Sequence, residues 1–253
     1  TAQISRSHPY ARLGGSDSGG SGEDKQDCSP KDELAMGTHG FRADRATSYG
    51  KLEDVARRIR RSVLHTPHSQ ALDGVRLFEN LHRLSVTVTG SKQPVRMDYA
   101  VNELPKGLEA LALYDDEDDA FLIALSPGTY DALLRGDPRA RFSLCHEIAH
   151  AALHPELLIR MSTLQYPDAA LHRGEVREHP VYLDTEWQAH ALAAALLVPA
   201  DALAELEEHG RLSVREIEIR FGVSNEAATV RLDVYERKKA DLLRLADMEG
   251  VTR

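Results

Sequence analysis

The sequence contains only two cysteines, Cys28 and Cys145, among its 253 residues. Cys28 lies in a polar N-terminal stretch and Cys145 directly precedes His146. Two cysteines so placed do not form the dense framework of a disulfide-stapled secreted protein. We therefore expect a reducing compartment and a cytoplasmic location. For Cys145, which has apolar neighbours, we favour a small packing residue over a redox-sensitive thiol.

Long apolar runs and an excess of positive charge are also missing. No apolar run reaches the roughly 18 residues of a membrane-spanning helix. No apolar stretch follows a basic start, so we expect no signal peptide. The 31 Lys and Arg residues face 40 Asp and Glu residues, and the formal net charge is −9. Because neutralising phosphates requires clustered cations, this balance disfavours non-specific nucleic-acid binding.

Composition divides the chain into three predicted parts. Residues 1–47 are rich in Gly, Ser, Asp and Lys, which predicts a disordered tail or linker. Apolar residues at helical spacing begin near residue 48, and residues 48–200 are predicted to form a folded domain. Residues 201–253 form a predicted helical, helix-turn-helix-like segment.

Hydrophobic periodicity predicts an α+β fold that is mainly helical, with a small sheet of three to four strands. The acidic run at residues 115–119 is interpreted as a solvated hairpin loop rather than a cation site, because it lacks a cation-loop spacing. Residues 156–183 are expected to be irregular. The predicted strands cover residues 85–89, 110–114 and 120–125. The predicted helices cover residues 48–63, 72–82, 129–134, 139–153, 185–197, 200–208, 213–220 and 224–244.

The segment His146-Glu147-Ile148-Ala149-His150 has the residue types and the spacing of a zinc-peptidase helix. Residues four apart share one helix face, so His146 and His150 can offer two imidazole nitrogens to one Zn²⁺. Glu147 projects beside that face, where its carboxylate can act as general base toward a water molecule. The alternative is a helix with two histidines that bind no metal, which the apolar flanks of the motif disfavour.

A catalytic zinc needs a third protein ligand and one open position. Glu186 is the first choice, because it opens an Ala-rich helix that can pack closely against the histidine helix. His154 follows His150 by four residues, and His190 follows Glu186 by one turn. Either histidine could be a ligand, orient another ligand or simply pack, and both rank below Glu186. Two His and one Glu suit Zn²⁺, and they also accept Mn²⁺ or Fe²⁺.

Two stretches, residues 141–155 and 186–199, resemble the ImmA/IrrE family of bacterial metallopeptidases. In that family the first typically reads R-F-(T/S)-x-x-H-E-(L/I)-x-H-x-x-x-H-P. The second typically reads E-x-x-A-(N/D)-x-F-A-A-x-L-L-(M/V)-P. The start of the hairpin near residue 102 and the Phe221-Gly222-Val223-Ser224 turn fit as well, so the resemblance covers about residues 50–240.

The resemblance implies that residues 48–200 are a zincin-like zinc metallopeptidase domain, followed by a helix-turn-helix-like segment. It implies that His146, His150 and Glu186 bind the metal and that Glu147 is the general base. It also implies a protein substrate, a helix-turn-helix transcriptional repressor whose loss relieves repression after stress. The chain departs from the pattern at His190, where Asn or Asp is usual, and at a leucine two residues later, where Phe is usual. Neither departure removes a predicted ligand.

The C-terminal segment has a second interpretation. Residues 213–238 read as two helices joined by a turn, in which Gly222 suits a left-handed position and Ser224 suits an N-cap. A DNA-reading helix pair should expose basic or amide side chains where its second helix begins. Because Glu216 and Glu218 would repel phosphate, we favour a structural or protein-recognition role. The alternative function is a non-catalytic regulator, DNA-binding or antitoxin-like, that uses this segment.

Overall fold

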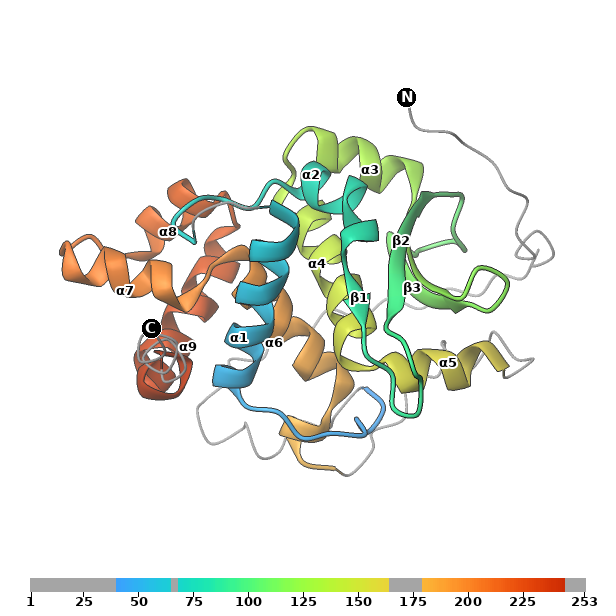
Figure 1. Ribbon diagram of the computed structural model, residues 1–253. Coiled ribbons are helices and arrows are strands. Elements are labelled where there is room, and N and C mark those ends of the chain that lie inside the picture. The colour runs from blue at the N-terminus through green and yellow to red at the C-terminus, as the bar shows by residue number, and fades with distance from the viewer. Residues whose placement is uncertain (1–39, 65–67, 164–178, 244–253) are drawn as a thin grey trace, which may run out of the picture.

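The computed structural model describes residues 40–64, 68–163 and 179–243, which form helices around one small sheet (Figure 1). The strands are β1 Ser85–Val86, β2 Val95–Val101, β3 Ala110–Asp115 and β4 Ala120–Leu125. The helices are α1 Tyr49–Ile59, α2 Gly74–Glu79, α3 Pro127–Leu134, α4 Pro138–Leu153, α5 Pro155–Thr163, α6 Thr185–Leu197, α7 Ala200–Glu208, α8 Val214–Phe221 and α9 Asn225–Leu243. Single turns of π- or 3₁₀-helix cover Arg60–Leu64, Leu81–Arg83 and Val181–Leu183. The predicted α+β class, mainly helical with a small sheet, is confirmed.

The sheet has the strand order β1-β2-β4-β3, so β3 lies at one edge. β3 and β4 pair antiparallel, from Ala110 opposite Leu125 to Asp115 opposite Ala120, and form the hairpin that the acidic loop predicted. β2 pairs parallel with β4, while β1 pairs antiparallel with β2. The sheet is therefore mixed, and β3 is the strand that packs most extensively against α4 and α5.

Three elements differ from the prediction. The strand expected over residues 85–89 is reduced to β1, and β2 was not expected, although Val95, Met97 and Tyr99 alternate with polar residues as in a half-buried strand. The third difference is α5, which lies in a region predicted to be irregular. Pro155 ends the pattern of α4 but is also a favourable first residue for a new helix. The rest of the irregular region falls partly outside the described residues.

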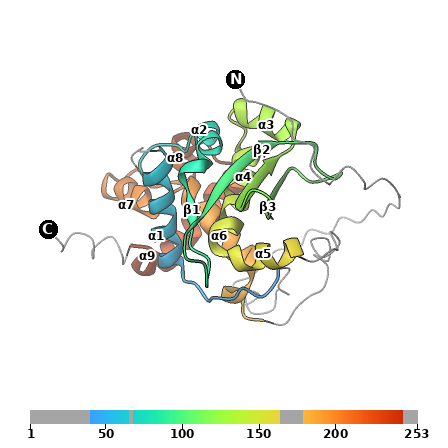
Figure 2. The same cartoon turned by 45° about the vertical axis from the view of Figure 1, so that its right-hand side comes forward.

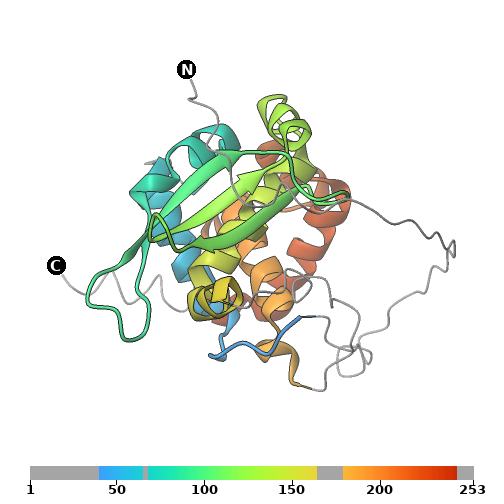
Figure 3. The ribbon, with the colours of Figure 1, turned by 90° about the vertical axis from the view of Figure 1, so that its right-hand side faces the viewer.

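Helices α4 and α6 run side by side through the centre of the molecule, with the sheet on one side and α7–α9 on the other (Figures 1, 2 and 3). Both begin at an aspartate N-cap: Asp137 accepts a hydrogen bond from the Ala140 N–H, and Asp184 accepts one from the Trp187 N–H. Buried alanines such as Ala193 face the neighbouring elements of the core, and their small side chains let helices approach closely. This contact places the α6 residue Glu186 opposite the two α4 histidines.

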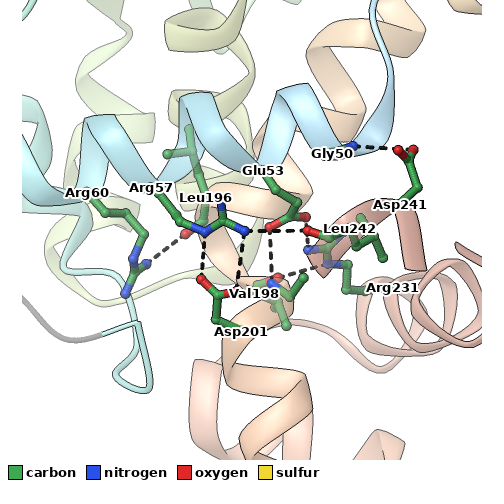
Figure 4. Close-up of polar contacts among 11 residues, drawn as sticks. Gly50, Glu53, Arg57, Arg60, Leu196, Val198, Asp201, Arg231, Asp241 and Leu242 are labelled. Atoms are coloured by element: carbon green, nitrogen blue, oxygen red, sulfur yellow. Dashed lines mark hydrogen bonds and ion pairs between the residues drawn. The ribbon is translucent and has the colours of Figure 1, made fainter. Parts of the chain in front are cut away.

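The N-terminal and C-terminal helices are joined by a buried ion pair (Figure 4). Glu53 of α1 and Arg231 of α9 are each about 3% exposed and contact each other directly. Arg231 Nε also donates to the Val198 carbonyl at 2.8 Å, and the Ala200 N–H donates to Glu53 at 3.1 Å. Every charged group of the pair therefore has partners, as burial requires. The predicted boundary between residues 48–200 and 201–253 stays a prediction, but this network connects both sides of it.

The turn between α8 and α9 has the predicted helix-turn-helix geometry. Gly222 ends α8 in the left-handed region at φ 59°, and Ser224 caps α9 by accepting a hydrogen bond from the Ala227 N–H. Asn225, the first residue of α9, donates its amide to Glu218 Oε2 at 2.9 Å. An amide engaged with a carboxylate is not free to read a base edge, which favours a structural role.

Replacing Gly222 by alanine should lower the free energy of unfolding by about 1–2 kcal/mol, because an L residue is strained in the left-handed region. A Cβ there would also lie 2.7 Å from Arg141 Nη2, so the guanidinium would have to move. Urea denaturation measures the change. The control is Gly128→Ala in α3, where a Cβ meets nothing within 4 Å, and it should gain about 0.4–1 kcal/mol. Equal stability of the two variants would contradict the strain.

The predicted tail lies mostly outside the described residues. Its last part, residues 40–47, is described and runs beside the start of α6: the Ala43 N–H donates to the Leu183 carbonyl, and the Thr185 N–H donates to the Phe41 carbonyl. Among the described residues no single helix is long and apolar enough to cross a membrane, although α6 and α7, with a 47° bend between them, pass such a test as a pair. The cytoplasmic location stays a prediction.

Candidate metal centre

The structure brings His146, His150 and Glu186 together at the contact of α4 with α6. Glu186 Oε2 lies 3.2 Å from His146 Nε2, and its Oε1 lies 3.4 Å from His150 Nε2. The two Nε2 atoms are 3.0 Å apart. All three side chains are partly buried. The Nε2 atoms of the two histidines and the two carboxylate oxygens of Glu186, which the sequence predicted as ligands, therefore face one another.

These distances fit a shared metal ion. Ligand atoms bound tetrahedrally at about 2.0–2.1 Å from zinc are about 3.3 Å apart, close to the 3.0–3.4 Å separations here. Although burial alone would raise the pKa of Glu186, the His146 and His150 rings beside the carboxylate hold that pKa well below its ordinary value. The carboxylate is then ionised, as a ligand must be. Which metal binds stays a prediction.

Glu147 lies on the sheet side of α4, where it is 8% exposed. Its Oε2 accepts a hydrogen bond of 2.8 Å from the Ala112 N–H of β3. In the antiparallel β3–β4 pair the backbone groups of alternate residues face away from the partner strand. The Ala112 N–H therefore donates to Glu147 rather than to a carbonyl of β4. This contact fixes the predicted general base against the edge strand, and nothing in the sequence pattern indicated Ala112.

His154 is buried behind His150, at the C-cap of α4. Its Nδ1 lies 3.2 Å from His150 Nδ1, and its Nε2 lies 3.1 Å from Gln188 Oε1 on α6. Burial, with the neighbouring His150, lowers the pKa of His154 to about 4. Because both ring nitrogens are occupied and the ring lies behind His150, the geometry favours an orienting role for His154 over ligation.

His190 lies on the exposed side of the centre, one turn along α6 from Glu186. Its Nδ1 is 2.8 Å from the Glu186 carbonyl oxygen, which can only accept, so Nδ1 carries the proton and Nε2 is bare. The rings of His190 and His146 are 4.6 Å apart. His146, Glu186 and His190 also offer ligand atoms within 4.8 Å of one another. His190 is thus a competitor of His150 for completing the ligand set.

Substituting His190 by asparagine, the residue usual at this position in the resembled family, distinguishes a ligand set completed by His150 from one completed by His190. If His150 completes the set, His190→Asn should keep a full equivalent of zinc, with an affinity loss below the roughly 10–100-fold typical of a lost supporting contact. Zinc content after dialysis, measured by elemental analysis, gives the answer. Zinc lost from His190→Asn but retained by His150→Asn would assign the third position to His190.

Two further residues support the centre without having been singled out in the sequence. Gln188 holds His154, as described above. Gly40 crosses the start of α6, where its N–H donates to Asp184 at 3.0 Å. A Cβ at Gly40 would come within 2.9 Å of Glu186 Cγ, so only glycine lets the chain pass this close to the ligand. Neither role has a local signal, because Gln188 is 34 residues from His154 and Gly40 is 144 residues from Asp184 in the sequence.

Cys145 is fully buried, although it directly precedes His146 on α4. Burial raises the pKa of its thiol to about 12, against the opposing charges of Arg141 and Arg60. A neutral buried thiol is a poor nucleophile and a poor metal ligand. These observations support the packing role favoured from the sequence. Cys28 lies outside the described residues.

Comparisons with known proteins agree with the site. A family model described as the IrrE N-terminal-like domain, Peptidase_M78, matches residues 134–233. This match confirms the resemblance predicted from the sequence, and the matched segment contains His146, Glu147, His150 and Glu186. A search of curated proteins gave no match.

A solved structure that is similar to this chain is a Mycobacterium tuberculosis transcriptional regulator, with 15% sequence identity and a TM-score of 0.40. The similarity covers 70% of this chain and 44% of that chain. This chain therefore spans less than half of the regulator's length, and a likeness this remote adds nothing to the functional argument.

Proposed function

We propose that this chain is a zinc-dependent endopeptidase that cleaves a regulatory protein, and the match of residues 134–233 to the IrrE N-terminal-like family model supports this proposal. The observation that carries the proposal is the convergence of His146, His150 and Glu186 beside Glu147. Two imidazole nitrogens and the carboxylate oxygens lie 3.0–3.4 Å from one another, and they would supply three ligands to a zinc ion whose fourth position is left for water or substrate.

Glu147 is the general base of the proposed reaction. Bound zinc supplies Lewis acidity, which polarises a carbonyl and lowers the pKa of a water molecule to about 7. The Glu147 carboxylate takes a proton from the attacking water and delivers it to the departing amine nitrogen. Because Oε2 already accepts a hydrogen bond from the Ala112 N–H, the other oxygen, Oε1, is the one that accepts and releases the proton.

The edge strand β3 supports a peptide as the substrate. By the alternation of the β3–β4 pair, Ala110 and Tyr114 direct backbone groups to the same side as Ala112. An extended peptide can hydrogen-bond to such an edge and add a strand to the sheet. A peptide aligned along β3 would pass next to Glu147, which the Ala112 N–H holds at that edge.

The substrate that we propose is a helix-turn-helix transcriptional repressor, on the family resemblance. The test combines the purified chain, Zn²⁺ and the repressor encoded beside its gene, and mass spectrometry locates the cleavage. We expect one major cut, lost with a chelator and restored by Zn²⁺. Equal cleavage of unrelated unfolded proteins would point instead to a broad-specificity peptidase, and cleavage that survives chelation would contradict the metal-dependent mechanism.

The alternative is a non-catalytic regulator that binds DNA or a partner through α8 and α9. The observation that favours it is the helix-turn-helix geometry around Gly222, and the engagement of Asn225 by Glu218 opposes it. A gel shift on the gene's own promoter, falling steeply with salt and unchanged in His146→Ala, would support this alternative over catalysis.

A further inference from the structure

A continuous line of hydrogen bonds connects the metal centre to the backbone on the far side of α6. His150 Nδ1 lies 3.2 Å from His154 Nδ1, and His154 Nε2 lies 3.1 Å from Gln188 Oε1. The Gln188 amide nitrogen in turn lies 2.9 Å from the Arg45 carbonyl and 2.8 Å from the Tyr182 carbonyl. His154 and Gln188 are 3% and 2% exposed, so water does not compete for these bonds.

The donor and the acceptor of each hydrogen bond can be assigned by starting from the two backbone carbonyls. Carbonyl oxygens only accept, so the two contacts with Arg45 and Tyr182 identify the Gln188 atom between them as the amide nitrogen. The opposite atom, Oε1, is an acceptor and faces His154. His154 Nε2 must therefore carry a proton and donate it to Gln188.

The positions of the protons on the His154 and His150 rings follow in the same way. The His154 ring is buried, and its two nitrogens contact His150 and Gln188 rather than a carboxylate, so the ring is neutral. With Nε2 protonated, its Nδ1 is bare and can only accept. His150 Nδ1 must then donate, which leaves His150 Nε2 with a free lone pair facing Glu186 and His146.

We propose that Gln188 and His154 are positioning residues that fix the tautomer of His150, so that its Nε2 lone pair is held ready for the metal. The inference rests on the proposed ligand set. It applies to one histidine of the pair, because among the described residues His146 Nδ1 is buried without a hydrogen-bond partner. Hydrogen bonds to the second ring nitrogen of a ligand are known to orient the ring and raise metal affinity.

Tautomers can be read directly by two-bond ¹H–¹⁵N correlation spectra of the ¹⁵N-labelled full chain, both zinc-loaded and metal-free. The expected spectra show His150 protonated at Nδ1 and His154 protonated at Nε2 in both forms. Gln188→Met removes the acceptor, so His154 should lose its single tautomer. Leu192→Met is the matched control, because it places the same side chain in a buried position one turn along α6 and should leave both tautomers unchanged.

Zinc affinity gives a second, independent measurement. His154→Leu removes the acceptor for His150 Nδ1 and should weaken zinc binding about 10–100-fold in a chelator competition. His154→Asn places an amide oxygen near the position of Nδ1 and should recover most of the affinity. A purely structural role for His154 would not distinguish these two variants at equal thermal stability.

The outcomes are separable from those of the proposed function. A wild-type spectrum with His150 protonated at Nε2 in the metal-free form would overturn the inference, even if peptidase activity is found. Equal zinc affinity in His154→Leu and the wild type would overturn it as well. If a variant fails to fold, the wild-type spectra alone decide. If no repressor is cleaved, by contrast, the tautomers can still be measured, and only the peptidase proposal is contradicted.

Discussion

Replacing Glu147 by glutamine should lower kcat for repressor cleavage by about 10²–10⁴-fold, which is the contribution of a positioned general base. Glutamine has the same shape, and its amide oxygen can still accept the Ala112 N–H. It cannot, however, take a proton from water. The zinc content should stay at the wild-type value, because Glu147 is not one of the proposed ligands and its Oε2 accepts the Ala112 N–H. A lower kcat together with an unchanged zinc content is the result expected for a general base.

Single-turnover kinetics with excess enzyme measures this change and separates chemistry from product release. Glu109→Gln is the matched control: Glu109 contacts Arg139 and Ser143 near the start of α4, and its carboxylate lies outside the proposed centre. Its rate should be close to that of the wild type. Unchanged cleavage in Glu147→Gln would remove Glu147 from the mechanism, and a simultaneous loss of zinc would make Glu147 a structural support of the centre.

The local part of the centre was predictable because helical spacing is local. His146, Glu147 and His150 share one helix, and periodicity alone puts the two histidines on the same face. Glu186 required one tertiary assumption, that an Ala-rich helix would pack closely against α4, and the structure has that contact.

Residues whose role depends on register or on distant backbone were not predictable. The role of Ala112 follows from the register of β3 against β4, since a shift of one residue would turn its N–H toward β4. Gln188 depends on carbonyls at Arg45 and Tyr182, which only the folded chain brings together. In the sequence it is a polar residue between a ligand and an alanine run, without a chemical signal of its own.

Removing the carboxylate of Glu186 should cause the largest loss of metal. Glu186→Ala leaves two histidine ligands, and zinc affinity should fall by more than the roughly 100-fold that marks the upper end for supporting residues. Cleavage should disappear with the metal, because Lewis acidity and an acidified water both depend on it. Elemental analysis after dialysis, followed by chelator competition, measures the loss.

The control for Glu186→Ala must also remove a glutamate from a helix's first turn, because an acidic residue there is stabilised by the helix dipole by about 0.3–1 kcal/mol. Glu226→Ala does so in α9, on the exposed surface and away from the centre. Both variants should lose similar dipole stabilisation, but only Glu186→Ala should lose zinc. Equal zinc content in the two variants would show that Glu186 is not the third ligand, and His190, which already lies within ligand distance of His146, would then be the residue to replace next.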